Sequence, residues 1–375
     1  MKILLVIDHF GSGGAQRQMV ELACGLKRRG HAVEMFTYFP RRDFFRAQLD
    51  RQQITVHEFD KGAGFSLQVV RRIATLVNSG AMDIVVSYLS SPNIYAELAR
   101  LIAPRAKLVV SERTNHLDDK SWIVATFRRA LHAIADQVVA NSESQSEWLR
   151  HKWWLRGKVT CIYNGLALET FSTGYVVPAE RIPLRLIAVG RVGPEKNPLN
   201  LIRALEALRR QGQLVELTWV GGRDGSSAGI AYCRQVDELL QSLPETAKHW
   251  HWLGEVSDIP RLLCEHHALV HPSLYEGLPN VVCEALAAGM PVLASRVCDH
   301  PLLVADGERG FLFDPLDPSD ISGAILRLQR LSNEGWNFLS RDARRYAEQN
   351  LGADRMVGAY ESLFSRLRTG IEPVT

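Results

Sequence analysis

Two glutamates eight positions apart, Glu276 and Glu284, are the side chains whose type and spacing point most directly to chemistry. Between them, Pro279 suits the first position of a helix, where a missing N–H costs nothing, and Gly289 is a stop signal. We therefore expect a helix over residues 279–288. Glu276 then lies in the loop before the helix and Glu284 in its second turn, roughly 6–8 Å further along the axis.

The start of this helix suits a phosphate, because the first N–H groups of a helix have no partner within it and stand at the positive end of its dipole. Asn280, Val281 and Val282 carry those groups. A diphosphate placed there would leave one carboxylate to reach a sugar on each side, which is the geometry that a nucleotide-sugar needs. The alternative is that Glu284 is a solvated helix residue and Glu276 a turn residue.

Two cations in another loop are expected to meet the same ligand. Arg191 and Lys196 follow an apolar strand and precede an amphipathic helix, so we expect them near the strand end that carries the Glu276 loop. Breaking an anomeric C–O bond leaves a diphosphate with growing negative charge, which cations held in place stabilise. The alternative is that both are surface cations. Since no acidic D-x-D motif follows a strand, we expect the chemistry to be metal-independent.

A glycine-rich turn near the start of the chain contains Gly13 and Gly14 between a strand and a helix. Residues without a Cβ let backbone approach a ligand closely. The turn lacks the G-x-G-x-x-G spacing of a dinucleotide site and the G-K-[S/T] ending of a P-loop, which disfavours an NAD-dependent oxidoreductase. The alternative is a tight turn that only packing requires.

Two segments resemble known motifs of one enzyme family. Residues 276–292 resemble the E-x7-E motif of the retaining GT-B glycosyltransferases of family four, and residues 190–196 resemble the G-R-x-x-x-x-K pattern of the same family. The resemblance covers most of residues 1–367. It implies a front-face retaining mechanism in which the departing phosphate acts as base, so that no protein nucleophile is required.

The resemblance also implies roles for individual residues. Glu276 would contact hydroxyls of the transferred sugar and Glu284 the nucleotide ribose, while Arg191 and Lys196 would bind the donor diphosphate. The implied catalytic set is Glu276, Arg191, Lys196 and Glu112. The implied donor-binding positions are Gly13, Gly14, Gly190, Gly254, Gly277, Leu278, Asn280, Val281 and Glu284.

The polar residue over the sugar is expected after the fifth front-domain strand, where family members often have a histidine or an acidic residue. Here the candidates are Glu112, Arg113 and His116. We expect Glu112 to supply the contact. Arg113 in the histidine position, or His116 swinging in, are alternatives, and so is a structural role for Glu112 in an ion pair.

Apolar runs alternate with longer amphipathic stretches, the pattern of parallel sheets covered by helices. The expected strands are 3–7, 32–38, 55–59, 84–88, 107–111, 137–140 and 160–162, then 184–189, 216–220, 250–253, 268–272, 292–294 and 310–313. We expect an α/β fold of two Rossmann-like, doubly wound domains facing across a cleft (GT-B). The expected divisions are an acceptor domain over 1–168, a linker over 169–183, a donor domain over 184–350, and a C-terminal helix within 351–375 that packs back on the first domain.

Length and composition agree with two cores and a reduced compartment. The chain has 375 residues, 46% of them hydrophobic, and single cores stop growing near roughly 250–300 residues. The six cysteines are scattered without metal-ligand spacing, as in a cytosolic protein. The start of the chain is too short an apolar run for a signal peptide, and no window approaches the roughly 18–20 apolar residues of a membrane span.

Charge is uneven along the chain. The net charge is +3, but residues 1–165 contain 23 Lys and Arg against 15 Asp and Glu, an excess of +8. Within that region, Trp148, Trp153 and Trp154 alternate with cations over residues 148–158. Such a segment suits the headgroup layer of an anionic membrane. The alternative is that these tryptophans pack in the domain core.

Together these features predict a retaining glycosyltransferase of the hexosyltransferase class. The expected donor is a nucleotide-diphospho-sugar, UDP-linked, from which a hexose or N-acetylhexosamine moves to a lipid-linked or growing glycan in polysaccharide or lipopolysaccharide synthesis. We expect a cytoplasmic enzyme, peripheral on the inner face of the plasma membrane, without metal, other cofactor or nucleic-acid partner. A UDP-sugar 2-epimerase of GT-B-like fold and a non-catalytic nucleotide-sugar binding protein are the alternatives.

Overall fold

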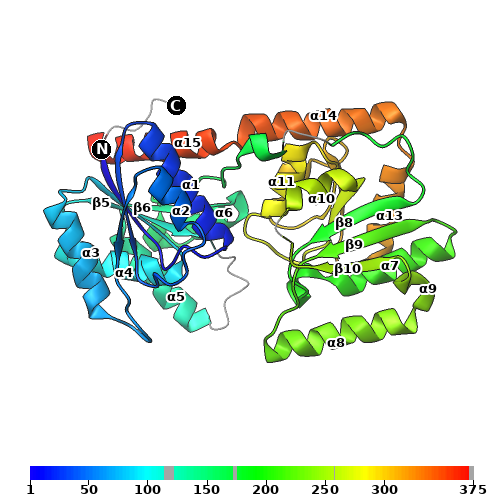
Figure 1. The fold of residues 1–375 in the computed structure, drawn as a ribbon, viewed down its shortest axis with the longest axis horizontal. Coiled ribbons are helices and arrows are strands. Elements are labelled where there is room, and N and C mark those ends of the chain that lie inside the picture. The colour runs from blue at the N-terminus through cyan, green and yellow to red at the C-terminus, as the bar shows by residue number, and fades with distance from the viewer. Residues whose placement is uncertain (114–121, 172–174, 257, 371–375) are drawn as a thin grey trace. The chain divides into compact units, whose positions relative to one another are not determined.

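The computed structural model describes residues 1–113, 122–171, 175–256 and 258–370 (Figure 1). The chain divides into two compact units. The first contains Met1–Gly165 and Ala353–Thr375, and the second contains Leu166–Gly352. Each unit is built around one parallel β-sheet.

The first unit has a seven-stranded sheet in the order β3-β2-β1-β4-β5-β6-β7. Its strands are β1 (Lys2–Val6), β2 (Ala32–Thr37), β3 (Thr55–Glu58), β4 (Ile84–Tyr88), β5 (Lys107–Glu112), β6 (Gln137–Ala140) and β7 (Val159–Cys161). Its α-helices are α1 (Gly14–Arg28), α2 (Arg46–Arg51), α3 (Leu67–Ser79), α4 (Ser90–Ile102), α5 (Trp122–Ala130), α6 (Glu143–Arg150) and α15 (Ala353–Thr369). Two 3₁₀ turns, η2 (Leu131–Ile134) and η3 (Trp153–Leu155), lie after α5 and α6.

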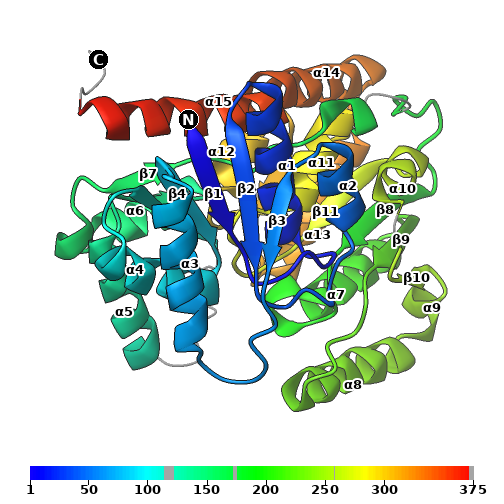
Figure 2. The same ribbon diagram turned by 60° about the vertical axis from the view of Figure 1, so that its left-hand side comes forward.

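Helices cover both faces of this sheet (Figure 2). Because side chains alternate between the faces of a strand, Ile3 and Leu5 of β1 pack in one apolar cluster with α1 and α15, whereas Leu4 and Val6 pack in another with α3 and α4. Both faces are thus buried, which explains why the strands read as continuous apolar runs.

The last helix, α15, belongs to the first unit although it comes at the end of the chain. Gly25 of α1 leaves room for Val357 of α15, which a Cβ at position 25 would overlap. The hydroxyl of Tyr88 at the end of β4 lies 2.9 Å from that of Tyr360. The last helix therefore helps to complete the core of the first unit.

The second unit has a six-stranded sheet in the order β10-β9-β8-β11-β12-β13. Its strands are β8 (Leu184–Val189), β9 (Val215–Val220), β10 (Trp250–Gly254), β11 (Ala268–His271), β12 (Val292–Ser295) and β13 (Gly310–Phe313). Its α-helices are α7 (Pro198–Arg210), α8 (Ser227–Ser242), α9 (Pro244–Ala247), α10 (Ile259–Glu265), α11 (Asn280–Ala288), α12 (His300–Val304), α13 (Pro318–Gln329) and α14 (Asn333–Asn350). The 3₁₀ turns η4 (Leu168–Phe171) and η5 (Pro194–Lys196) complete it.

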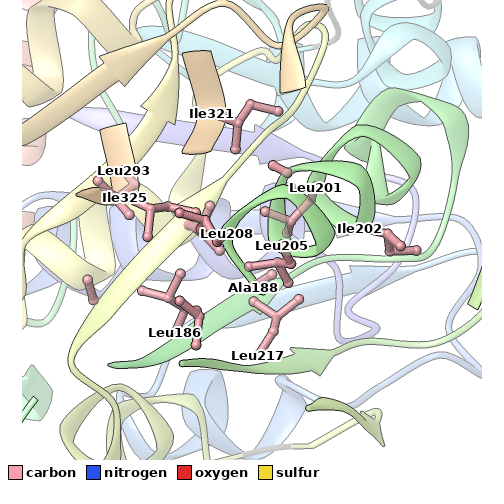
Figure 3. Close-up of a cluster of buried hydrophobic side chains, with 14 of the residues drawn as sticks. Leu186, Ala188, Leu201, Ile202, Leu205, Leu208, Leu217, Leu293, Ile321 and Ile325 are labelled. Carbon is pink, nitrogen blue, oxygen red and sulfur yellow. The ribbon is translucent and has the colours of Figure 1, made fainter. Parts of the chain in front are cut away.

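The core of the second unit lies between its sheet and the helices α7, α8 and α13. Figure 3 shows apolar side chains of α7 facing those of β8 and β9, among them Leu201, Leu205, Leu208, Leu186, Ala188 and Leu217. This packing holds β8 at the centre of the sheet between β9 and β11. The strand order reverses there, and ligands of such sheets bind beyond the carboxyl ends of the strands at that point.

All thirteen strands expected from the sequence are present, and each end agrees within one residue. The expectation of two doubly wound α/β units is therefore confirmed. Among the described residues, no helix has both the length and the apolar character needed to cross a bilayer.

The described residues from 166 to 183, which include most of the expected linker, pack on the second unit. The Leu166 N–H donates to the carbonyl of Leu351 over 2.8 Å, and the Tyr175 hydroxyl donates to that of His267 over 2.7 Å. Farther along, Arg181 donates to the Leu331 carbonyl over 2.8 Å. These bonds attach the segment to the second unit, so the first division falls after residue 165 rather than 168, and the second after 352 rather than 350.

Candidate functional site

Glycines form the strand ends at the reversal point of the second sheet. Gly190, Gly221 and Gly254 follow or end β8, β9 and β10 with φ of 154°, 142° and 71°. A Cβ at position 221 would collide with the Gly190 carbonyl, which in turn accepts a 2.8 Å hydrogen bond from the Trp219 indole. The backbones of Gly190 and Gly221 are thereby brought close together at this edge, with no side chain between them.

Lys196 is brought to the loop after β11 by the residue that follows it. Asn197 has a left-handed conformation, with φ of 54°, and begins α7. Its side-chain amide donates to the carbonyls of Pro272, over 3.2 Å, and Pro315, over 2.7 Å. This buried asparagine ties the β8 loop to the loops after β11 and β13, so the position of Lys196 does not depend on its own side chain alone.

Glu276 is the centre of a compact polar cluster. Its Oε1 accepts hydrogen bonds from the Lys196 ammonium, from His271 Nε2 at 2.9 Å and from the Ser273 hydroxyl at 2.7 Å. The side chains of Lys196 and Glu276 are only 19% and 15% exposed. The convergence of Lys196 and Glu276, eighty residues apart in the chain, is what the sequence predicts for a single ligand site.

The charges in this cluster are set by its burial and by its partners. Burial alone would raise the pKa of Glu276, but the hydrogen bond from His271 and the charge of Lys196 hold that pKa well below its ordinary range. Burial lowers the pKa of His271, and the charge of Lys196 acts in the same direction. Near pH 7 the carboxylate is therefore ionised and the imidazole neutral.

The tautomer of His271 follows from its partner. A carboxylate can only accept hydrogen bonds, so the proton of the neutral ring lies on Nε2, 2.9 Å from Glu276. His300 packs edge-on against the same ring, with centroids 5.3 Å apart, and burial lowers the pKa of His300 to about 3. The ionised Glu276 thus accepts from one neutral imidazole, His271, and a second neutral imidazole, His300, packs against the ring of the first.

Helix α11 begins one residue later than expected, at Asn280, with Pro279 as its cap, and ends as expected at Ala288, followed by Gly289 with φ of 78°. The expectation of an unused N–H at Val282 is wrong, because this group donates to the Pro279 carbonyl over 3.0 Å. Glu284 lies half-buried in the second turn, where the sequence placed it.

The other residues near α11 that are expected to bind the donor differ in how far their side chains are exposed to solvent. Gly277 and Asn280 are partly accessible, whereas the side chains of Leu278 and Val281 are buried. Leu278 and Val281 therefore offer a ligand their backbone rather than their side chains. Their apolar side chains anchor the loop and the first turn of the helix.

Arg191 is not part of the Glu276 cluster. Its side chain is 60% exposed and lies 3.4 Å from Glu195, four residues on. The carbonyl of Glu195 in turn accepts a 2.8 Å hydrogen bond from the N–H of Leu274, in the Glu276 loop. The backbone that follows Arg191 is therefore bonded to the Glu276 loop, while the Arg191 side chain itself is accessible to solvent.

The sequence interpretation missed His271, Ser273 and Asn197. The first two could have been found, because they are polar residues at the end of an apolar strand directly before the Glu276 loop. Asn197 gave a weaker signal, since an asparagine before a proline at a helix start is common for local reasons alone.

The glycine turn of the first unit is shaped by a side chain. Helix α1 begins at Gly14 with Gly13 as its cap. A Cβ at Gly13 would overlap the side-chain oxygen of Gln16, whose amide donates to Asp8 over 3.0 Å. Local packing thus accounts for Gly13 whether or not a ligand approaches it.

Glu112 is held in a buried ion cluster, which corrects the expectation that it contacts a sugar. Its carboxylate is 2% exposed and lies 3.1 Å from His132 Nε2, 3.4 Å from Arg128 and 3.5 Å from Arg129. Burial opposes ionisation, but His132 and the two arginines hold the pKa of Glu112 below its ordinary value. The alternative of a structural role in an ion pair therefore fits Glu112 better than a contact with the sugar.

The other candidates at this strand end have different surroundings. Arg113 stacks on the Tyr88 ring, 4.1 Å from its centroid, and hydrogen-bonds the side chain of Asn164. His116 lies outside the described residues. Arg113 is thus the candidate whose described surroundings leave it partly accessible at this edge.

Glu112→Gln is expected to lower the free energy of unfolding by about 3–5 kcal/mol, because it leaves buried cations without their counter-charge. Urea denaturation at pH 7 measures this change. Glu143→Gln is the matched control, since Glu143 pairs with Arg150 at 3.4 Å but is 47% exposed, and it should change stability little. Equal, small effects of both substitutions would contradict the structural role of Glu112.

The fold matches solved structures of the GT-B class. Anabaena HepE, solved in complex with UDP, matches with a TM-score of 0.82 and 20% identity, over 97% of this chain and 100% of that one. Together with the two parallel sheets, this match defines a protein of the GT-B fold.

Family comparisons give the particular class. The family described as Glycosyltransferase Family 4 matches residues 12–170, and the one described as Glycosyl transferases group 1 matches residues 183–330. The two ranges cover most of the chain. The chain therefore belongs to the group 1, family-four glycosyltransferases, as its motifs predicted.

Curated relatives match part of their length. The Escherichia coli UDP-Gal:α-D-GlcNAc-diphosphoundecaprenol α-1,3-galactosyltransferase is 26% identical over 216 residues, 55% of this chain and 54% of the relative. The D-inositol 3-phosphate glycosyltransferase of Streptomyces avermitilis is 34% identical over 203 residues, 50% of this chain and 43% of the relative. The chain thus spans about half the length of these relatives.

Proposed function

We propose that this chain is a retaining glycosyltransferase that moves a hexose or N-acetylhexosamine from a UDP-sugar to a lipid-linked or growing glycan. The observation that carries the proposal is the pairing of Lys196 with Glu276 at the carboxyl ends of β8 and β11. The relatives support the substrate classes, since one acts on a diphosphoundecaprenol-linked sugar and HepE was solved with UDP.

The residues of the cluster divide the chemistry between them. Lys196, bonded to Glu276 in the loop before α11, supplies positive charge for the diphosphate, which gains negative charge as the anomeric C–O bond breaks. Glu276 is held ionised and accepts hydrogen bonds from sugar hydroxyls, which fixes the sugar relative to its leaving group. His271 and Ser273 fix Glu276 in turn.

Retention follows if the acceptor attacks from the face that the diphosphate leaves. The acceptor hydroxyl forms the new bond to the anomeric carbon, and its proton passes to the departing diphosphate. Glu276, ionised and already bound to three donors, suits sugar positioning and is not assigned as a covalent nucleophile.

We place this reaction in the cytoplasm, at the inner face of the plasma membrane, in polysaccharide or lipopolysaccharide synthesis. The excess of +8 charges over residues 1–165 supports an encounter with an anionic surface or acceptor. A lipid-linked acceptor would be presented there.

A panel of nucleotide-sugars, offered with undecaprenyl-diphosphate-linked sugars as acceptors, tests the proposal. The expected result is release of UDP together with a product whose new linkage keeps the anomeric configuration of the donor, read by proton NMR. A 2-epimer of the donor sugar would instead support an epimerase. Donor binding without release of nucleotide under any acceptor would support a binding protein.

Activity is expected to survive EDTA, because Lys196 supplies at the diphosphate the charge that a metal supplies in other enzymes. UDP release should be measured with and without a millimolar excess of chelator. A loss of activity that added Mg²⁺ restores would contradict the metal-independent mechanism.

A further inference from the structure

Arg113 is a half-buried cation whose described partners are all neutral. It directly follows β5, and its guanidinium lies over the Tyr88 ring, 4.1 Å from the ring centroid. It donates to the hydroxyl of Ser111, over 3.4 Å, and to the side-chain oxygen of Asn164. In the part of the chain that the structure describes, no carboxylate forms an ion pair with Arg113.

The acidic residue next to Arg113 in the chain does not supply the missing charge. The carboxylate of Glu112 already lies beside Arg128, Arg129 and His132. Burial opposes a charge on His132, but its hydrogen bonds to two glutamates raise the pKa to about 9, so this ring is also cationic at pH 7. Since removing a charge from water without a counter-charge is costly, Arg113 is suited to an anion from outside the chain.

The partners of the guanidinium are themselves held by other elements of the first unit. The Tyr88 hydroxyl lies 2.9 Å from that of Tyr360 on α15. Asn164 precedes Gly165, whose N–H and carbonyl both bond to the side-chain amide of Gln18 on α1, each over 2.9 Å. The guanidinium is therefore preorganised, which reduces the entropy that binding a ligand costs.

The guanidinium also lies at the edge of the sheet where a ligand is expected. The strand order of the first sheet reverses between β1 and β4, and ligands of such sheets bind beyond the carboxyl ends of the strands at that point. Tyr88 is the last residue of β4, so stacking on it holds Arg113 at this end of the sheet. An arginine has five N–H donors in a planar fork that matches a phosphate or a carboxylate, and donors remain beyond the bonds to Ser111 and Asn164.

The substrates of the proposed function limit which anion this can be. The diphosphate of the donor is assigned to Lys196, in the second unit. The hydroxyls of a neutral glycan would leave the charge of Arg113 without a counter-charge. The remaining oxyanions are the diphosphate of a lipid-linked acceptor and, for a uronic acid donor, the carboxylate of the sugar. The diphosphate is the choice that does not depend on the identity of the sugar.

We propose that Arg113 binds a phosphate oxygen of a lipid-diphosphate-linked acceptor and thereby selects such an acceptor over an uncharged growing glycan. The proposal rests on the proposed function and deepens it, because it decides between the two classes of acceptor. It uses none of the residues assigned to the donor.

Binding of two lipids in the same detergent, measured by isothermal titration calorimetry, tests this role. The lipids are undecaprenyl-diphosphate-linked N-acetylglucosamine and undecaprenyl N-acetylglucosaminide, which lacks the diphosphate. The unchanged chain should bind the diphosphate form more tightly. Arg113→Gln should weaken that binding by about tenfold to a hundredfold, the range for a hydrogen bond to a charged group, and leave binding of the uncharged form unchanged.

Two further variants separate the charge at this position from charge in general. Arg72→Gln is the matched control, because Arg72 also stacks on an aromatic ring of the first unit, 5.1 Å from the centroid of Phe59. It removes the same charge and should bind both lipids like the unchanged chain. Arg113→Lys keeps the charge but loses the planar fork, so it should bind the diphosphate form less tightly than the unchanged chain and more tightly than Arg113→Gln. Urea denaturation shows which variants fold, and Arg113→Lys carries the test if Arg113→Gln does not.

The outcomes separate this proposal from the proposed function. Equal binding of the two lipids by the unchanged chain, or equal losses for both lipids in the Arg113 variants, would overturn the role of Arg113 even if UDP release and sugar transfer are observed. Weaker binding of UDP-glucose by Arg113→Gln would overturn it in favour of a donor contact. Weaker binding of UDP-glucuronate alone would overturn it in favour of a sugar carboxylate. Selective binding of the diphosphate lipid without any sugar transfer would instead uphold the role of Arg113 and contradict the proposed function.

Discussion

Lys196→Ala is expected to lower kcat for sugar transfer by about 100- to 1,000-fold, the range seen when a preorganised group that stabilises transition-state charge is removed. The ammonium of Lys196 is largely buried and is bonded to Glu276, so water cannot readily replace it. The measurement is UDP release at saturating donor and acceptor, with circular dichroism as a check of the fold.

Lys248→Ala is the matched control for this substitution. Lys248 lies in the same unit and pairs with Glu245 at 2.7 Å, but its side chain is 63% exposed. We expect kcat to stay within about twofold, because exposed ion pairs contribute little. If Lys196→Ala and Lys248→Ala behaved alike, Lys196 would have no part in stabilising the leaving group.

The same variant should change the pH dependence. In the unchanged chain, the pKa of Glu276 is held well below its ordinary range, in part by the charge of Lys196. Its ionised form therefore stabilises the fold above the ordinary pKa of a glutamate, and this contribution disappears only as the pH falls through the lowered value. Without Lys196, one of the causes that lower the pKa of Glu276 is lost while burial still acts to raise it, so that pKa rises and the acid limb of kcat/KM should move to higher pH.

The fold could be predicted because its signals are local. Most strands are short apolar runs between turn residues, and the central ones, such as β4 and β11, are buried on both faces, so their limits are visible in the sequence. The two divisions between units were predicted less well. The segment after Gly165 has the composition of a linker, but its hydrogen bonds to Leu351, His267 and Leu331 come from distant parts of the chain.

The part of the candidate site that could be predicted is the part whose position follows from the order of the strands alone. Lys196 and Glu276 follow β8 and β11, which are neighbours wherever a doubly wound sheet reverses. The partners of Glu276 were not predicted, because the hydrogen bonds of His271 and Ser273 depend on how one loop folds back on its own strand.

Glu112 shows why a motif position alone does not establish a role. It ends β5 where a ligand contact is expected, but its charge is neutralised by His132, twenty residues later, and by the end of α5. A buried charge without a partner costs much free energy, so such a cluster forms only if every charge in it is paired. Nothing in the sequence near Glu112 shows that a turn of 3₁₀ helix brings His132 beneath it.

Glu276→Gln is expected to lower kcat/KM by about 100-fold or more, because the charge that orients the sugar is lost while the shape of the side chain is kept. The amide oxygen can still accept from Lys196, so the fold should persist. Glu245→Gln is the control, with a carboxylate that is 59% exposed. Wild-type activity of Glu276→Gln would show that this residue does not position the sugar.

His271→Asn tests whether the histidine acts through Glu276. It removes a hydrogen bond to a charged group, worth about 1.5–3 kcal/mol, so kcat/KM should fall by about tenfold to a hundredfold. If His271 only positions Glu276, adding His271→Asn to Glu276→Gln should cost much less than it does alone, because the two residues act as one unit. Additive losses would instead mean that His271 serves the reaction, or the fold, independently of Glu276. Unfolding free energies of the same four proteins separate these two cases, since a purely structural role would lower stability by the same amount whether residue 276 is Glu or Gln.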